Sequence, residues 1–491
     1  MKKVTVVLPE KLGTVAPEIY GHFSEHIGGV FYGGLWVGKD SVIPNEKGFR
    51  KDALDALRKI NPPVLRWPGG CFAEVYNWRD GIGNNRPIRT NWWTAWDGRL
   101  ESNEVGTHEF FDLCELIGAK AYLAINVTSI TPLQARDWLD YCLSPRGSTS
   151  LALEREANGH PEPFNIDFVG IGNENWGDGG NMTPDYYALE YRRFATVLKN
   201  VCKGFKKSPL FVAGGANGSA IEWTHGLCNN LKDARSTPKE AMSLHYYCSF
   251  GGSCGDAVNY NVDQWYKQLE SAEKMEEIIE RHYAITKGYR MEGSLGKLVV
   301  DEWGCWHPDG SGPSKGYNLF EQQSTMREAV VTALTFNIFN NHCDKVRMAN
   351  VAQICNNIHS LLLAGDGYCF TTPTYHVFDM YKGHQGATAI RTLVSENENV
   401  KSRVSVSASE KDGYLTVTFA NYCCEKEAKI KLSLLGGSGK CISATVLCSK
   451  NMNDHNTPEE PNKVMPKQID VDIKKTITMP KASVMTLIIK L

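Results

Sequence analysis

The sequence predicts an α/β fold, in which a (β/α)8 TIM barrel is joined to a C-terminal antiparallel β-sandwich domain of jelly-roll type. From its start to about Ile390, short apolar runs alternate with amphipathic helical patterns, which is typical of βαβ units in a parallel sheet. After about Thr392, short spans alternate polar with apolar residues between turns rich in Gly, Asn, Asp and Lys, which is typical of antiparallel strands. A chain of 491 residues is also too long for one compact core, so two domains are expected.

Short apolar runs in the first part are the candidate barrel strands. They are Ile19–Phe23, Val64–Trp67, Ala121–Val127, Phe168–Gly172, Leu210–Gly214, Met242–Tyr246, Leu298–Asp301 and Val346–Ala349. Between them, apolar residues recur every three or four positions, as they do along one face of a helix. The predicted helices are Lys51–Ile60, Thr107–Ile117, Pro132–Tyr141, Pro184–Val201, Val262–His282 and Gln322–Asn340. Eight such strands, separated by helices, predict a closed parallel barrel.

Short alternating spans in the second part predict the strands of the sandwich. They are Val400–Ser407, Tyr414–Asn421, Ala428–Ser433, Ile442–Leu447, Thr476–Met479 and Ala482–Ile489. The early segment Lys2–Leu8 alternates in the same way, so it is expected to add a strand to the sandwich. We therefore predict that residues 1–14 are an N-terminal strand of the β-sandwich, residues 15–385 the barrel and residues 386–491 the β-sandwich domain.

The charge of the chain excludes several classes of partner. A formal net charge of −2 and a pI near 6.7 give no basic surface for nucleic acid or an anionic membrane. The apolar run after Met1 ends within a few residues at Pro9, which is too short for a signal peptide, and no run reaches transmembrane length. We therefore expect a cytoplasmic protein with a neutral partner, although a signal removed before residue 1 leaves no trace in this numbering.

A count of fifteen cysteines invites a disulfide or metal interpretation, but their positions favour neither. Most stand singly in apolar or amphipathic segments, without the CxxC pairs that zinc sites usually show. Cysteine packs as a small apolar side chain, and thiols stay reduced in the cytoplasm. We expect free buried thiols, no metal and no organic cofactor.

Two of the predicted strands end in a glutamate. Phe168–Gly172 leads into an Asn and then Glu174, and Leu298–Asp301 leads into Glu302, which is followed by Trp and Gly. Because the carboxyl ends of parallel barrel strands share one face, the two carboxyl groups can meet over a single bond. Two such groups are the requirement for glycoside hydrolysis.

Either glutamate also has a simpler structural explanation. A glutamate at a strand end often caps the following helix or forms a salt bridge, and taken alone Glu174 is more easily explained in that way. Its neighbours Asn173, Asn175 and Trp176 are the residue types that hold a sugar hydroxyl or stack on a ring face. Glu302 has a matching strand context. The two glutamates together therefore favour a catalytic pair.

Four motifs, in this order along the chain, resemble those of the α-L-arabinofuranosidases of glycoside hydrolase family 51. The motifs are Gly21–Gly28 (GHFSEHIG), Arg66–Gly70 (RWPGG), Gly172–Gly177 (GNENWG) and Asp301–Trp303 (DEW). The resemblance runs from about Ile19 to Tyr381, and it implies a retaining hydrolase on a (β/α)8 barrel followed by a β-sandwich. It also implies that Glu174, at the end of strand four, is the acid/base and that Glu302, at the end of strand seven, is the nucleophile. Counting strands from the residues alone gives the same two positions.

The resemblance also implies roles in the sugar site for further residues. These are Glu25, Arg66, Trp96, Asn173, His245, Tyr247 and Gln353. In the family pattern Glu25 binds ring hydroxyls, Asn173 binds the 2-hydroxyl, Arg66 orients a catalytic carboxylate and Tyr247 touches the nucleophile. Several of these residues have a plain alternative, namely an ion pair with His26 for Glu25, a buried arginine between strands for Arg66, and packing at the barrel rim for His245 and Tyr247.

One position departs from the family pattern. Many members have Asn after the Pro-Gly-Gly, where this chain has Cys71. An amide offers a sugar hydroxyl both a donor and an acceptor, whereas cysteine offers only a weak S–H. We predict that Cys71 faces the pocket, contacts the sugar or packs beneath it, and marks a somewhat different glycone preference.

The leading hypothesis is a retaining exo-acting α-L-arabinofuranosidase that acts on arabinoxylan, arabinan or oligosaccharides released from them. An endo-β-glucanase or xylanase uses the same glutamate pair, and an open groove instead of a closed pocket would identify it. A carbohydrate-binding protein without catalysis is a different class, and it has no need to hold two like charges together. A metal hydrolase that uses His245, His307 and the cysteines lacks ligand spacing. The resemblance also implies a homo-oligomer, commonly a hexamer, although no stretch of the sequence indicates one.

Overall fold

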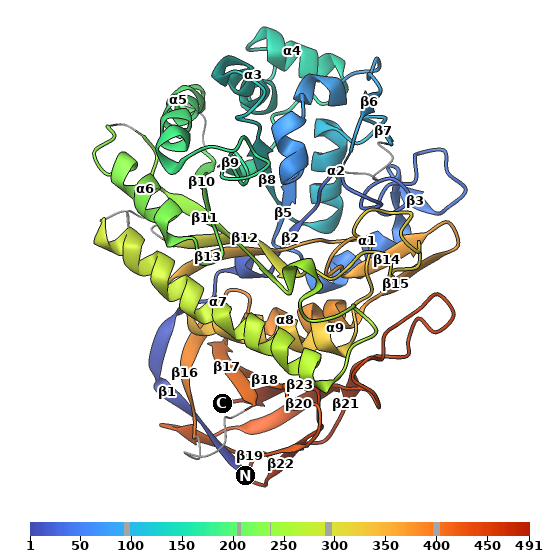
Figure 1. Ribbon diagram of the computed structural model, residues 1–491, viewed down its shortest axis with the longest axis vertical. Coiled ribbons are helices and arrows are strands. Elements are labelled where there is room, and N and C mark those ends of the chain that lie inside the picture. Colours follow the sequence, from blue (N-terminus) through green and yellow to red (C-terminus); the bar gives the residue numbers. More distant parts are fainter. Residues whose placement is uncertain (93–98, 204–207, 236, 290–296, 396–402) are drawn as a thin grey trace.

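The computed structural model describes residues 1–491 except 93–98, 204–207, 236, 290–296 and 396–402. Eight parallel strands close into a barrel, with a β-sheet domain below it in the view of Figure 1. Around the barrel the strands are β2 Gly21–Phe23, β5 Val64–Trp67, β8 Lys120–Ile125, β9 Ile166–Ile171, β10 Leu210–Asn217, β11 Ala241–Cys248, β12 Leu298–Cys305 and β13 Val346–Val351. The predicted barrel is therefore confirmed. The strands that carry the two glutamates, β9 and β12, are the fourth and the seventh.

The barrel strands are buried on both faces, which explains their continuous apolar sequences. Every residue of β9 and β12 is buried. Four strands continue beyond their predicted ends, and the extensions of β11 to Cys248 and of β12 to Cys305 concern the site directly; the other two are β10, which ends at Asn217, and β13, which ends at Val351. Their register places His245 opposite Glu302, so Glu302 lies inside β12 rather than just beyond it. This correction has a functional consequence, since continued pairing with β11 fixes the backbone that carries Glu302.

Helices surround the barrel, and the six predicted ones are present. They are α1 Lys51–Ile60, α2 Thr107–Ile117, α3 Pro132–Leu143, α5 Pro184–Cys202, α7 Val262–Gly288 and α8 Met326–Asn341. Helix α8 begins later than predicted because Thr325 and Glu328 form a capping box at its start. Three further helices were missed: α4 Ser150–Ala157, α6 Ile221–Leu231 and α9 Pro373–Tyr381. Gly226 in the middle of α6 weakens its helical signal, and α4 and α9 are too short to show a clear period.

The second part is one sheet of nine strands in the order β21-β20-β23-β18-β17-β16-β1-β19-β22. The strands are β1 Lys2–Thr14, β16 Thr388–Val394, β17 Val404–Lys411, β18 Tyr414–Asn421, β19 Ala428–Leu435, β20 Lys440–Leu447, β21 Lys467–Gln468, β22 Ile477–Met479 and β23 Ser483–Lys490. Val446 in β20 and Met479 in β22, which lie near opposite ends of this strand order, belong to the same hydrophobic core. The sheet therefore curls over so that its two ends approach each other. The neighbours are antiparallel except β1 and β19, which are parallel and far apart in the chain, so no hairpin dictates their direction.

Helix α8 joins the two parts, because it lies between the barrel and the sheet (Figure 1). Its residues from Met326 to Asn340 are all buried, as expected of a helix that is covered on every side. Asn337 Nδ2 donates to Ser405 Oγ at 3.2 Å, and Asn340 Nδ2 donates to Ser407 Oγ at 3.1 Å. These bonds satisfy polar groups at an otherwise apolar interface.

All fifteen cysteines are free thiols in the structure, ten of them buried and five partly exposed. Burial raises the pKa of thiols such as Cys114 and Cys142, so they remain protonated and pack as apolar groups. Among the described residues, no helix combines the length and the apolar character needed to cross a membrane.

Candidate active site

Nine of the ten predicted site residues meet at the carboxyl end of the barrel. They are Glu25, Arg66, Cys71, Asn173, Glu174, His245, Tyr247, Glu302 and Gln353. Six strands supply them, namely β2, β5, β9, β11, β12 and β13, or the loops that follow these strands. The tenth residue, Trp96, lies outside the described residues.

Glu174 and Glu302 lie side by side in this site. His245 Nδ1 is 2.7 Å from Glu174 Oε1 and 3.4 Å from Glu302 Oε2. A carboxylate oxygen of each glutamate and the imidazole nitrogen all lie within 4.8 Å of one another. The Glu174 side chain is 19% exposed and that of Glu302 is 7% exposed, so both carboxyl groups are largely shielded from solvent. The two groups are close enough to act on the same bond.

Two donors hold the carboxylate of Glu302. Arg66 Nη1 donates to its Oε1 at 2.7 Å, and the hydroxyl of Tyr247 donates to its Oε2 at 2.7 Å. Arg66 also donates from Nη2 to Asn173 Oδ1 at 2.6 Å, and its guanidinium lies over the ring of Phe23 at 4.5 Å. A guanidinium and a phenol both stabilise the ionised form of a carboxyl group. This environment suits a carboxylate that attacks as an anion.

Glu174 has a different environment. Strand β9 ends at Ile171, and the chain then turns through Gly172 at φ +84° and Glu174 at φ +40°, both in the left-handed region. Burial raises the pKa of Glu174; the hydrogen bond from His245 opposes this effect, and the negative charge of Glu302 adds to it. A carboxyl group with a raised pKa keeps its proton to higher pH than an ordinary glutamate does. This is the property that a general acid needs.

Asp301 also belongs to the site, although the sequence analysis did not predict it. Its Oδ1 lies 2.9 Å from His245 Nε2, and its Oδ2 accepts from the Tyr122 hydroxyl at 2.9 Å. Burial opposes ionisation of both partners, but Arg66 and His245 lower the pKa of Asp301, and Glu302 and Asp301 raise the pKa of His245 well above its usual value. The two ring nitrogens of His245 therefore face one carboxyl group each, that of Glu174 at Nδ1 and that of Asp301 at Nε2. Its position directly before Glu302 was the only sequence signal for Asp301.

Glu25 and Gln353 meet next to the carboxyl pair. Glu25 Oε1 accepts from two backbone N–H groups of the loop after β5, at 2.9 and 3.0 Å, and its Oε2 accepts from Gln353 Nε2 at 3.1 Å. Burial, together with the negative charge of Glu302, raises the pKa of Glu25 to about 7. Gln353 Oε1 and Asn173 Nδ2 are buried, and in the described part of the chain neither has a hydrogen-bond partner. Such groups need a partner from outside the protein, and hydroxyl groups can supply one.

Cys71 begins the 3-10 helix η2, Cys71–Val75, which follows the Pro-Gly-Gly turn after β5. Its Sγ lies 4.0 Å from Glu174 Oε2. Burial, with the negative charges of Glu174 and Glu25, raises the pKa of this thiol, so it remains an S–H group. Cys71 is therefore a weak donor directly beside the candidate acid.

Two groups of three side chains in the described part of the chain have spacings that would also suit a metal ion. They are Glu174, His245 and Glu302, and Cys305, His307 and Glu328. One glutamate of each group is already paired with an arginine, because Arg66 donates to Glu302 at 2.7 Å and Arg327 donates to Glu328 at 3.0 Å. A guanidinium that neutralises a buried carboxylate takes the electrostatic place of a metal ion. Both groups are thus explained as charge-paired side chains.

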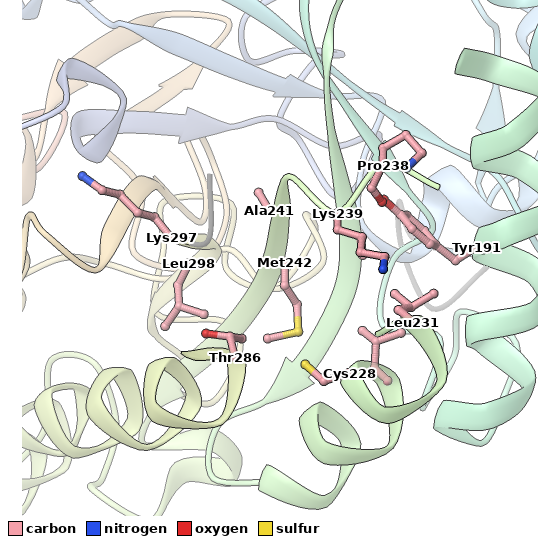
Figure 2. Close-up of a pocket in the computed structure, with 12 residues that line it drawn as sticks. Tyr191, Cys228, Leu231, Pro238, Lys239, Ala241, Met242, Thr286, Lys297 and Leu298 are labelled. Carbon is pink, nitrogen blue, oxygen red and sulfur yellow. The ribbon is translucent and has the colours of Figure 1, made fainter. Parts of the chain in front are cut away.

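A mostly apolar cavity of about 30 Å³ lies between β10–β12 and helices α6 and α7, and Figure 2 shows the residues that line it. Ala241 and Leu298, which line it, are the first residues of β11 and β12. The cavity therefore lies at the amino end of the barrel, opposite to the carboxyl pair. The surface of the cavity is mostly apolar, with Cys228 and Met242 among the residues that line it, so this small space is a packing void rather than a site.

A parallel barrel that holds a close carboxyl pair at the carboxyl ends of strands four and seven, among groups suited to hydroxyls, defines a glycoside hydrolase. Residues 56–265 match the family model "Alpha-L-arabinofuranosidase 1 domain", and residues 301–483 match "Alpha-L-arabinofuranosidase C-terminal domain". The chain belongs to the α-L-arabinofuranosidases of glycoside hydrolase family 51.

Similar proteins cover the whole chain. An intracellular exo-alpha-L-arabinofuranosidase of Bacteroides ovatus is 37% identical over 99% of this chain and 95% of its own length. The crystal structure of a GH51 arabinofuranosidase from Xanthomonas axonopodis pv. citri is 34% identical, with a TM-score of 0.92 over 99% of each chain. An arabinose complex of an alpha-L-arabinofuranosidase from Thermotoga maritima is 28% identical, with a TM-score of 0.86 over 100% of each chain. The family resemblance that the four motifs carried is therefore confirmed.

Proposed function

We propose that this chain is a retaining, exo-acting α-L-arabinofuranosidase that releases terminal arabinofuranosyl residues by double displacement. The separation of the two carboxyl groups carries this proposal, since oxygens of Glu174 and Glu302 lie within 4.8 Å. Retaining glycosidases hold their carboxyl groups about 5–5.5 Å apart, whereas inverting enzymes need roughly 6.5–9.5 Å to fit a water between them. The geometry therefore favours a covalent intermediate.

In the first step, Glu302 attacks the anomeric carbon while Glu174 gives its proton to the leaving oxygen, and the glycosidic bond breaks. Arg66 and Tyr247 hold the carboxylate of Glu302 in place until it attacks. In the second step, Glu174 takes a proton from water, the water oxygen bonds to the anomeric carbon, and the bond to Glu302 breaks. Both glutamates then return to their starting protonation states.

The hydrogen bond from His245 makes the two carboxyl oxygens of Glu174 inequivalent. Its Nδ1 donates to Oε1 at 2.7 Å, so Oε2 is the oxygen left to carry the acidic proton. Oε2 faces the Cys71 side of the pocket. Because His245 is itself held by Asp301, its ring cannot turn away from Glu174 without breaking a buried ion pair. The proton donor thus has a fixed orientation.

The remaining polar groups bind the sugar. Asn173 Nδ2 donates to the 2-hydroxyl, a contact that strengthens in the transition state. Glu25 and Gln353 bind other ring hydroxyls through Glu25 Oε2 and the unpaired Gln353 Oε1. The sugar thereby satisfies groups that are buried without a partner in the described residues.

The similar proteins support the substrate and the cellular setting of this proposal. The Bacteroides ovatus relative is described as exo-acting and intracellular. We infer a cytoplasmic enzyme of hemicellulose degradation and L-arabinose metabolism, active on arabinoxylan, arabinan or oligosaccharides derived from them, and assembled as a homo-oligomer. An endo-glucanase, an endo-xylanase or a non-catalytic carbohydrate-binding protein is disfavoured by membership of an arabinofuranosidase family.

The first test uses the wild-type protein. It is expected to hydrolyse 4-nitrophenyl α-L-arabinofuranoside, and NMR of the first product formed should show the α anomer, because two displacements retain the configuration. Arabinan and arabinoxylan should release free arabinose. Release of larger oligosaccharides without free arabinose would favour an endo-acting enzyme, and binding without turnover would favour the carbohydrate-binding alternative.

Cys71→Asn is expected to change the ratio of kcat/KM between arabinofuranosides and galactofuranosides or xylosides by up to about tenfold, which corresponds to one hydrogen bond of about 0.5–1.5 kcal/mol. The amide would offer a donor and an acceptor where the thiol offers only S–H. Cys441→Asn, at a half-buried thiol in the sheet domain, serves as the control and should leave the ratio unchanged. An unchanged ratio in Cys71→Asn would remove Cys71 from the determinants of specificity.

A further inference from the structure

Glu74 is a buried carboxylate that the proposed mechanism does not use. It lies in η2, three residues after Cys71, and its side chain is 1% exposed. A buried carboxylate is costly unless hydrogen bonds replace the water that it has lost. The arrangement of those bonds indicates what Glu74 does.

The carboxylate of Glu74 ties together the ends of three neighbouring strands. Its Oε1 accepts from the backbone N of Asn173 at 2.7 Å and from Asn175 Nδ2 at 3.2 Å. Its Oε2 accepts from the backbone N of Val127 at 2.8 Å and of Thr128 at 2.9 Å. The loop after β5 is thereby bound to the ends of β8 and β9. All four partners are donors, so the carboxylate form is the one that fits.

The end of β9 is where such support is needed. The left-handed conformation of Glu174, at φ +40°, is unfavourable for a residue that has a side chain, and it persists only where the surroundings fix it. The N–H that Glu74 holds belongs to Asn173, directly before Glu174. On the other side of the turn, Gly177 N donates to Glu174 O at 2.7 Å. The turn is therefore fixed on both sides, by Glu74 before Glu174 and by Gly177 after it.

We propose that Glu74 is a positioning residue that fixes the turn through Asn173 and Glu174 and so aims the acid/base at the leaving oxygen. The inference rests on the proposed function, because it takes Glu174 as the acid/base. Glu74 acts through the backbone of the turn, and its own carboxylate is fully engaged by the protein. A misplacement of about 1 Å of a catalytic group can cost about 100-fold in rate.

Glu74→Gln tests this role because it keeps the size of the side chain but turns one acceptor into a donor. The amide nitrogen would then face an N–H group of either Asn173 or Thr128. The hydrogen bonds that Glu74 makes to that strand end would be lost. We expect kcat/KM to fall about 100-fold for methyl α-L-arabinofuranoside, whose leaving group needs a proton, and less than about fivefold for a dinitrophenyl arabinofuranoside, whose leaving group does not. The ratio of the two losses is the readout.

Glu18→Gln is the matched control. Glu18 is also 1% exposed, but it precedes β2 at the amino end of the barrel, where Lys120 Nζ donates to it at 2.5 Å and Arg347 pairs with it. This variant should lower the Tm and leave the ratio between the two substrates unchanged. The control therefore distinguishes a general loss of stability, which lowers the Tm, from a displacement of Glu174, which changes the substrate ratio.

Equal losses on the two substrates, or no loss on either, would overturn the positioning role while leaving the proposed function intact. A wild type that hydrolyses neither substrate would instead overturn the proposed function. If Glu74→Gln fails to fold, Glu74→Asp and Asn175→Ala give the same readout. The first withdraws the carboxylate by one CH₂ group, and the second removes one of its donors.

Discussion

Replacement of Glu302 by alanine is expected to lower kcat on 4-nitrophenyl α-L-arabinofuranoside on the order of 10⁴-fold or more. The proposed mechanism needs this carboxylate to form the bond to the anomeric carbon, so its loss removes the covalent route. The neighbouring Asp301 is a poor substitute, because Tyr122 and His245 each hold one of its oxygens at 2.9 Å. Steady-state kinetics with equal protein concentrations provides the measurement.

The stereochemistry of rescue makes the assignment of Glu302 specific. Azide that enters the space vacated in Glu302→Ala attacks from the face that Glu302 used, so the arabinosyl azide formed should have inverted configuration. Glu302→Gln is the isosteric control, since it preserves packing and should be as inactive as the alanine variant. Thermal unfolding of both variants checks that Arg66 and His245, left without one buried anion, have not unfolded the barrel. Turnover within tenfold of wild type would remove Glu302 from the nucleophile role.

The barrel could be predicted from the sequence because its strands are buried on both faces. β9 and β12 therefore stand out as continuous apolar runs between amphipathic helices, and their order places the two glutamates on strands four and seven. The ends of the strands could not be predicted as well. β11 and β12 continue to Cys248 and Cys305 because they pair with each other, and pairing between distant segments leaves no local pattern.

The same limit applies within the site. Glu302 and Glu174 carry a local signal, since each follows an apolar run. Asp301 follows the same apolar run as Glu302, but the roles of Asp301 and Glu74 leave no local signal, because they arise from donors that lie more than fifty residues away in the chain, such as Tyr122 for Asp301 and Asn173 for Glu74. A buried carboxylate of this kind is indistinguishable in sequence from one on the surface. Only the fold reveals which donors surround it.

Replacement of Glu174 by alanine is expected to give a different pattern of loss from Glu302→Ala. General acid–base catalysis contributes about 10²–10⁴-fold, so kcat/KM should fall by that factor for methyl α-L-arabinofuranoside and change little for a dinitrophenyl arabinofuranoside. The glycosyl-enzyme then accumulates, because no base activates water. Azide needs no base, so it should restore turnover and give an arabinosyl azide of retained configuration, opposite to that expected from Glu302→Ala.

The pH dependence provides an independent check on Glu174. Because burial and the charge of Glu302 raise its pKa, although His245 opposes them, the protonated acid persists to higher pH than an ordinary glutamate allows. The rate of the first step should be full below this pKa and fall as the pH rises through it. In Glu174→Ala that alkaline fall should disappear from kcat/KM. In the control Asn217→Ala it should remain, because Asn217 is an exposed residue at the end of β10 that pairs with His245 only through the strand register. An alkaline fall that persists in Glu174→Ala would assign the titrating proton to another group, with Glu25, whose pKa is raised to about 7, the first to test.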